Sequence, residues 1–115
     1  MAERAPTVVQ LMAEHTDVFL WNRSPDRGPE DDYELRPAEL GVSPGLAERL
    51  SAWNEEYGRL ALRPDVAFES PEEAASWRRA GLHLAHALQD ELGPDIEVRY
   101  AEDGDPRPVR ERRGS

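Results

Sequence analysis

Apolar residues recur at helical spacing in the middle of the chain. Between positions 43 and 60 they follow one another at intervals of four, three, four and three residues: Leu46, Leu50, Trp53, Tyr57 and Leu60. This spacing places them on one face of an amphipathic helix. Ser43 followed by Pro44 is typical of an N-cap and first helical position, and Pro64 prevents continuation. The pattern therefore predicts a helix from about Ser43 to Leu60.

A second helix is predicted from Pro71 to Leu92. Ser70 can cap its first turn, with Glu73 reaching back to form a capping box, and Gly93 followed by Pro94 is typical of a helix end. Its apolar face contains Ala74, Trp77, Gly81, Leu84, Ala85, Leu88 and Leu92. A mid-helix glycine costs about 1 kcal/mol relative to alanine, so we interpret Gly81 as the place where the first helix approaches closely.

The ends of the ordered chain are predicted to form a sheet. Residues 96–100 alternate apolar and charged positions, as a strand with one buried face does. Thr7 to Ala13 fits both a strand, through Val8 and Val9, and a helical period, so periodicity alone leaves this segment open. The predicted fold class is α+β: two consecutive amphipathic helices packed on a small sheet formed by N- and C-terminal strands.

Two segments show no such periodicity. Residues 22–41 contain Pro25, Pro29 and Pro37 together with several acids, which predicts an irregular loop, ending in one short turn at Pro37 to Leu40. Residues 101–115 are rich in proline and arginine, which predicts a disordered tail. The predicted organisation is one domain over residues 1–100 followed by this tail.

Several of these positions together resemble small uncharacterised proteins of high-GC bacteria, over roughly residues 7 to 100. The resemblance is carried by Leu20-Trp21, Leu40-Gly41-Val42-Ser43, Leu46, Leu50, Trp53-Asn54, Gly81, Leu84-Ala85, Leu88 and Glu91-Leu92-Gly93-Pro94. It implies a strand, a loop with the Leu-Trp pair, two helices and a closing strand, which favours the strand interpretation of the N-terminal segment. It implies no activity.

Composition removes several functions. All 14 basic residues are arginine, so lysine nucleophiles, Schiff-base lysines and phosphate-loop lysines are excluded. The 115 residues include no cysteine, which excludes disulfides and thiolate metal sites. No apolar stretch approaches the roughly 20 residues that a membrane helix needs, and because no apolar core follows Met1 to Pro6 we expect no signal segment. We expect a cytoplasmic bacterial protein without a cofactor and without membrane contact.

The net charge indicates the kind of partner. With 24 acids against 14 bases the formal charge is −10, and a domain this negative repels nucleic acid. A basic protein is the complementary partner, because opposite charge speeds its association. We therefore expect a non-catalytic acidic protein-binding module, an adaptor or an immunity-like inhibitor. The predicted contact surface is Trp21, as an aromatic anchor, with the loop that follows it and the acids Asp26, Glu30, Asp31 and Asp32. The alternative for Trp21 is that it folds back to cap the core formed by Trp53 and Trp77.

Two other functions fit parts of the sequence. His83, His86 and Asp90 lie at i, i+3 and i+7 of the second helix and could hold a divalent metal ion in an enzyme or a metal sensor; the alternative is a solvated polar stripe. A sheet of two strands is marginal and exposes its edges, which favours a self-associating structural protein or a homodimer. The serines lack the context of a catalytic nucleophile.

Overall fold

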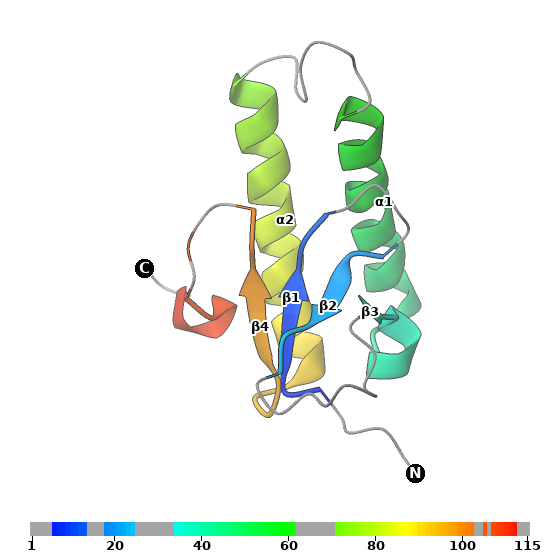
Figure 1. The fold of residues 1–115 in the computed structure, drawn as a ribbon, viewed down its shortest axis with the longest axis vertical. Coiled ribbons are helices and arrows are strands. Elements are labelled where there is room, and N and C mark those ends of the chain that lie inside the picture. Colours follow the sequence, from blue (N-terminus) through cyan, green and yellow to red (C-terminus); the bar gives the residue numbers. More distant parts are fainter. Residues whose placement is uncertain are drawn as a thin grey trace.

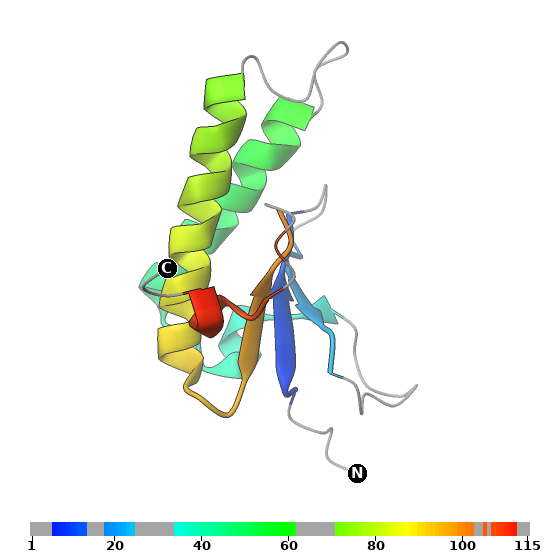
Figure 2. The same cartoon turned by 90° about the vertical axis from the view of Figure 1, so that its left-hand side faces the viewer.

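Two long helices lie against one face of a mixed four-stranded sheet in the computed structural model of the protein (Figures 1 and 2). The structure describes residues 6–13, 18–24, 34–61, 71–102, 105 and 107–112. The helical layer and the sheet layer confirm the predicted α+β class. Figure 2 shows both helices on the same side of the sheet, and the ends of the helices nearest their connection extend beyond it.

The helices closely match their predicted ranges. The first, α1, spans Pro44–Ala61, and the second, α2, spans Pro71–Leu92. Ser43 caps α1 as predicted, because its hydroxyl accepts the Leu46 N–H at 3.4 Å and its carbonyl accepts the Ala47 N–H at 2.9 Å. Gly93 ends α2 with a φ of 82°, the left-handed conformation predicted from the Gly-Pro pair. The Ser70 cap lies outside the described residues.

The sheet has the order β3-β2-β1-β4. Strand β1, Val8–Leu11, is central and pairs antiparallel with β2, Leu20–Asn22, and parallel with β4, Glu97–Tyr100. The N-terminal segment is therefore a strand, and both predicted strands lie side by side (Figure 1).

The loop prediction for residues 22–41 was wrong in part. Asn22 ends β2, and a two-residue strand β3, Glu34–Leu35, pairs with β2. The Leu20-Trp21 pair, which the resemblance places in a loop, also lies in β2. The short turn predicted at Pro37 to Leu40 is confirmed as the 3₁₀ helix η1, Pro37–Leu40. Strands this short lack enough residues for alternation to be recognised in the sequence.

The core lies between the helices and the sheet. Its fully or almost fully buried members come from both layers: Val9, Leu11, Leu20, Leu46, Leu50, Trp53, Trp77, Ala85, Leu88, Val98 and Tyr100. Gly81 acts as predicted, because a Cβ at this position would lie 2.7 Å from the Trp53 ring and nearer still to the Tyr100 hydroxyl. The missing side chain thus admits α1 and also the end of β4.

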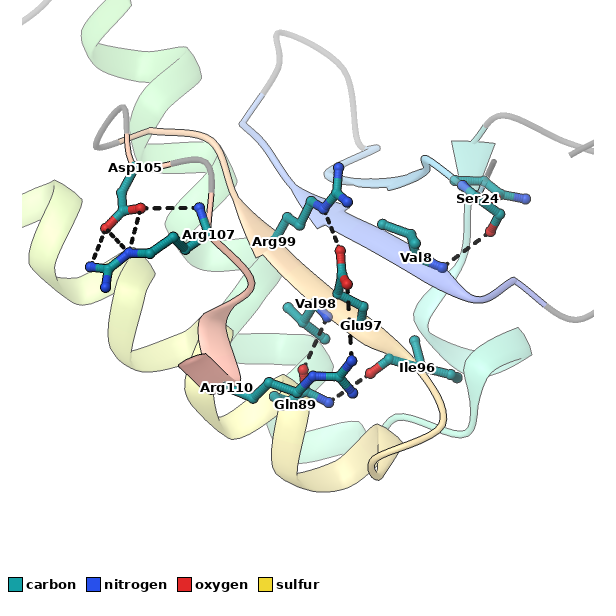
Figure 3. Close-up of polar contacts among 11 residues, drawn as sticks. Val8, Ser24, Gln89, Ile96, Glu97, Val98, Arg99, Asp105, Arg107 and Arg110 are labelled. Carbon is teal, nitrogen blue, oxygen red and sulfur yellow. Dashed lines mark hydrogen bonds and ion pairs between the residues drawn. The ribbon is translucent and has the colours of Figure 1, made fainter. Parts of the chain in front are cut away.

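Hydrogen bonds from side chains connect neighbouring elements of the fold (Figure 3). The buried Gln89 side chain donates to the carbonyls of Gly93 at 3.0 Å and Ile96 at 2.7 Å and accepts the Val98 N–H at 3.0 Å. It thereby joins the end of α2 to the start of β4. On the other edge of β1, the Ser24 hydroxyl accepts the Val8 N–H at 3.1 Å.

The C-terminal segment differs from the predicted disordered tail. Pro108 forms an antiparallel bridge with Arg99, and Val109–Arg112 form a second 3₁₀ helix, η2, in which Val109 is fully buried. Arg110 donates to the Pro94 carbonyl at 2.6 Å. The composition of the segment does not reveal this order, because one valine provides its anchor and the surface that buries it is formed by distant residues.

The search of the described residues for membrane-spanning helices identifies none with the length and apolar character that crossing a bilayer requires.

Candidate functional site

Trp21, the predicted partner anchor, is part of the sheet. Its side chain is only 7% exposed, and its indole N–H donates to the Met12 carbonyl at 3.0 Å. Because side chains alternate along a strand and Leu20 belongs to the core, Trp21 points to the helix-free face. It therefore does not cap the Trp53–Trp77 pair. The four predicted acidic contacts, Asp26, Glu30, Asp31 and Asp32, lie outside the described residues.

The helix-free face carries a row of residues that crosses the whole sheet. The strand registers align Glu34 of β3 with Trp21, Trp21 with Gln10 of β1, and Gln10 with Arg99 of β4. Glu34 and Arg99 are exposed at the two ends, whereas Gln10 is half-buried between them. This face is polar at both ends with an aromatic residue between them.

Charged groups at the β4 edge are paired with one another (Figure 3). Glu97 forms ion pairs with Arg99 and, at 3.9 Å, with Arg110 of η2. Asp105 pairs with Arg107 at 2.8 Å, which raises the pKa of that guanidinium. Since the Arg99–Pro108 bridge also lies here, the chain's own C-terminal segment covers part of the β4 edge.

The three predicted metal ligands do not form a metal site. His83 and Asp90 are exposed and His86 is half-buried on α2. Within the described ranges, no group of three or more histidine, cysteine, aspartate or glutamate residues could hold a metal ion. Shared helical spacing places these residues on one side of α2, but a metal requires donors that converge on a point.

A groove of about 460 Å³ lies between α1 and α2. Ala52 and Trp53 of α1 and Ala80 and Leu84 of α2 form its apolar walls. The ionisable residues at this groove are Arg49, Glu56 and His83, all exposed. Gly81, one residue beyond Ala80, contacts Tyr100 of β4, so the groove opens on the side of the helix pair away from the sheet.

Sequence reasoning did not identify this groove. Of its ionisable residues, His83 is a predicted metal ligand, and Arg49 and Glu56 have no predicted role. One feature of the sequence does point to the groove. Ala52 and Ala80 occupy exposed helical positions, where a long polar residue is more usual.

Near one end of the groove, the two helices are joined by Glu91. This carboxylate accepts the Ser43 backbone N–H and the Ser43 hydroxyl, both at 2.7 Å. The two hydrogen bonds lower the pKa of Glu91 below its ordinary value of 4.5, with a smaller contribution from Arg49. The last turn of α2 is thus attached to the first turn of α1.

Comparison with known proteins identifies a family. Residues 7–103 match the family model described as Serratia CdiI immunity protein-like. No curated protein matches the chain. The resemblance drawn from the sequence implied no activity, whereas the description of this family names an immunity protein.

Proposed function

We propose that this chain, which belongs to the Serratia CdiI immunity protein-like family, binds a toxic protein and blocks its action without chemistry of its own. The observation that carries the proposal is the extent of the family match. The matched residues 7–103 include all four strands and both helices. The likeness therefore concerns the whole folded unit rather than one short motif.

The charge of the chain supports a basic partner. A formal charge of −10 raises the rate at which a positively charged protein associates and orients it during approach. An inhibitor needs fast association, because the toxic protein acts until it is bound. We infer that the partner's contact surface is rich in lysine or arginine.

The acids of the loop stay the predicted contacts for that surface. Asp26, Glu30, Asp31 and Asp32 supply four negative charges within a short segment. Trp21, with its buried side chain, would act by holding strand β2, which precedes this acidic segment, rather than by contacting the partner. The cytoplasmic location stays a prediction as well.

A growth experiment tests the function. Fragments of secreted proteins from the source genome are expressed from an inducible promoter, each with and without this chain. We expect at least one fragment to arrest growth alone and to be harmless when the chain is present, and the purified pair to form a stable complex. If the chain relieves no arrest caused by any fragment, the proposal is wrong.

Salt dependence and matched variants test the basic partner and the acidic loop. The dissociation constant should rise steeply with ionic strength, because salt screens exposed charges. Asp31→Asn with Asp32→Asn should slow association, whereas Glu39→Gln with Glu111→Gln removes the same charge at exposed positions elsewhere and should have a smaller effect. Binding that is independent of salt would contradict the basic partner, and equal effects of the two double variants would contradict the loop.

A further inference from the structure

A specific protein interface needs more than charge. Its affinity usually depends on a few side chains that enter well-packed pockets, surrounded by contacts that exclude water. Trp21 does not supply such an anchor, since it is buried in the sheet. The groove between α1 and α2 offers the complementary feature, an apolar hollow that can receive an anchor from the partner.

The walls of the groove are held in place before any partner arrives. The Trp53 ring stacks on Trp77 at a centroid distance of 4.6 Å, and its N–H is bonded to the Trp77 carbonyl at 3.1 Å. Glu91 and Ser43 join the two helices near the start of α1. A preformed hollow binds more tightly because little conformational entropy is lost on binding.

The size and lining of the groove fit apolar groups. Its volume of about 460 Å³ lies within the usual range for ligand pockets. Ala52 and Ala80 are short, so the hollow reaches Trp53 and Leu84 between the helices. These walls would bury an aromatic or aliphatic side chain.

The charges on the two helices indicate which kind of residue flanks the anchor side chain in the partner. At the groove itself Glu56 and Arg49 carry opposite charges, and Glu48 and Glu55 are further exposed acids on the same helix. On α2 the exposed base is Arg79, and the exposed acids are Glu72, Asp90 and Glu91. Acids thus exceed bases among the exposed residues of the two helices that form the groove, which complements an anchor flanked by basic residues.

We propose that this groove is the docking site for the toxic protein and takes an aromatic or aliphatic side chain flanked by basic residues. The inference rests on the proposed function, because it names the surface that this function uses. It adds a surface on the helical layer to the acidic loop predicted from the sequence.

Filling the groove tests the inference. Ala52→Arg, Ala80→Arg and Ala80→Glu place long side chains into it at exposed helical positions, and Ala38→Arg on η1 is the matched control. The probe is the toxic fragment identified by the growth experiment, with affinities measured by calorimetry on the full chain. Thermal unfolding identifies variants that still fold, and Ala52 and Ala80 provide two independent positions.

The expected result is that both Ala80 variants and Ala52→Arg weaken binding by roughly 30-fold or more, the effect of losing one strong anchor, while Ala38→Arg binds normally. In NMR spectra the ring signals of His83, at the groove, should shift on binding, and those of His86 should not. If Ala80→Arg weakens binding of the fragment but Ala80→Glu does not, the effect comes from charge alone, and the proposal of an apolar docking site is wrong.

Two further outcomes separate this inference from the function. If the unmodified chain binds the fragment and all groove variants bind equally well, the inference is wrong and the function stands. If the unmodified chain binds no fragment, the function itself fails. Light scattering that shows a dimer abolished by Ala80→Arg would make the groove an interface between two copies and would also overturn the inference.

Discussion

Trp53 and Trp77 form a reciprocal pair in which each indole N–H donates to the backbone carbonyl of the other residue, both at 3.1 Å. Their rings stack 4.6 Å apart at an angle of 6°, and Tyr57 packs against Trp77 at 5.4 Å. The pair satisfies two buried donors, and its Trp53 ring also lines the groove. Stability and the candidate docking surface therefore both depend on Trp53, which Trp77 holds in place.

Replacing either tryptophan should affect both helices. Trp53→Phe or Trp77→Phe removes one of these hydrogen bonds and part of a buried ring, and should lower the free energy of unfolding by about 2 kcal/mol, measured by urea denaturation. Either change should also abolish the circular dichroism signal of coupled indole rings. Trp21→Phe, which leaves the pair intact, should keep that signal; its loss there would contradict the assignment.

Substitution by alanine should change the stability of the protein in opposite directions at two glycines in the helices. Gly81→Ala forces a Cβ against the Trp53 ring and the Tyr100 hydroxyl and should destabilise the fold by about 1–3 kcal/mol, as overpacking does. Gly45→Ala meets nothing within 4 Å and should gain up to about 1 kcal/mol from helix propensity. Thermal unfolding measures both, and a gain at Gly81 would contradict the close approach of α1 and β4.

The bond between Glu91 and Ser43 should make stability depend on pH. Because folding lowers the pKa of Glu91 below 4.5, its contribution is present above that pH and is lost as the pH falls through the lowered value. Glu91→Gln should therefore destabilise the protein at neutral pH and have a shrinking effect in acid. The check is a series of urea midpoints against pH, and the difference should diminish in a Ser43→Ala background.

Removing the Gln89 side-chain amide should detach α2 from β4. Gln89→Leu leaves the Val98 N–H and the Gly93 and Ile96 carbonyls without this partner and should cost about 2–3 kcal/mol. Gln10→Leu on the helix-free face is the comparison, since the Gln10 side chain bonds only weakly, to Met12 sulfur at 3.7 Å. Equal losses in the two variants would refute the role given to Gln89.

The C-terminal segment should contribute to stability. Val109 is fully buried, so Val109→Ala should lower the free energy of unfolding by about 1–2 kcal/mol. Glu111→Ala, at an exposed position of the same turn, should change it little. A neutral Val109→Ala would favour the disordered tail predicted from composition.

Much of the helical layer follows from local sequence. The range of α2, the cap at Ser43, the end at Gly93 and the alternation in β4 all concern residues within a few positions of one another. Helix spacing, capping and strand alternation are short-range patterns, so one sequence carries them completely. Negative charge and the absence of cysteine and lysine restrict the chemistry in the same direct way.

Tertiary structure alone decided the order of the strands, the burial of Val109 and the convergence of Ala52 and Ala80 on one groove. The Trp53–Trp77 bonds join residues 24 positions apart, and β1 pairs with a strand near the other end of the chain. Such contacts depend on how whole elements pack, and no periodicity records the pairing. The sequence by itself determined the elements and the charge, whereas packing determined which exposed residues form a common surface.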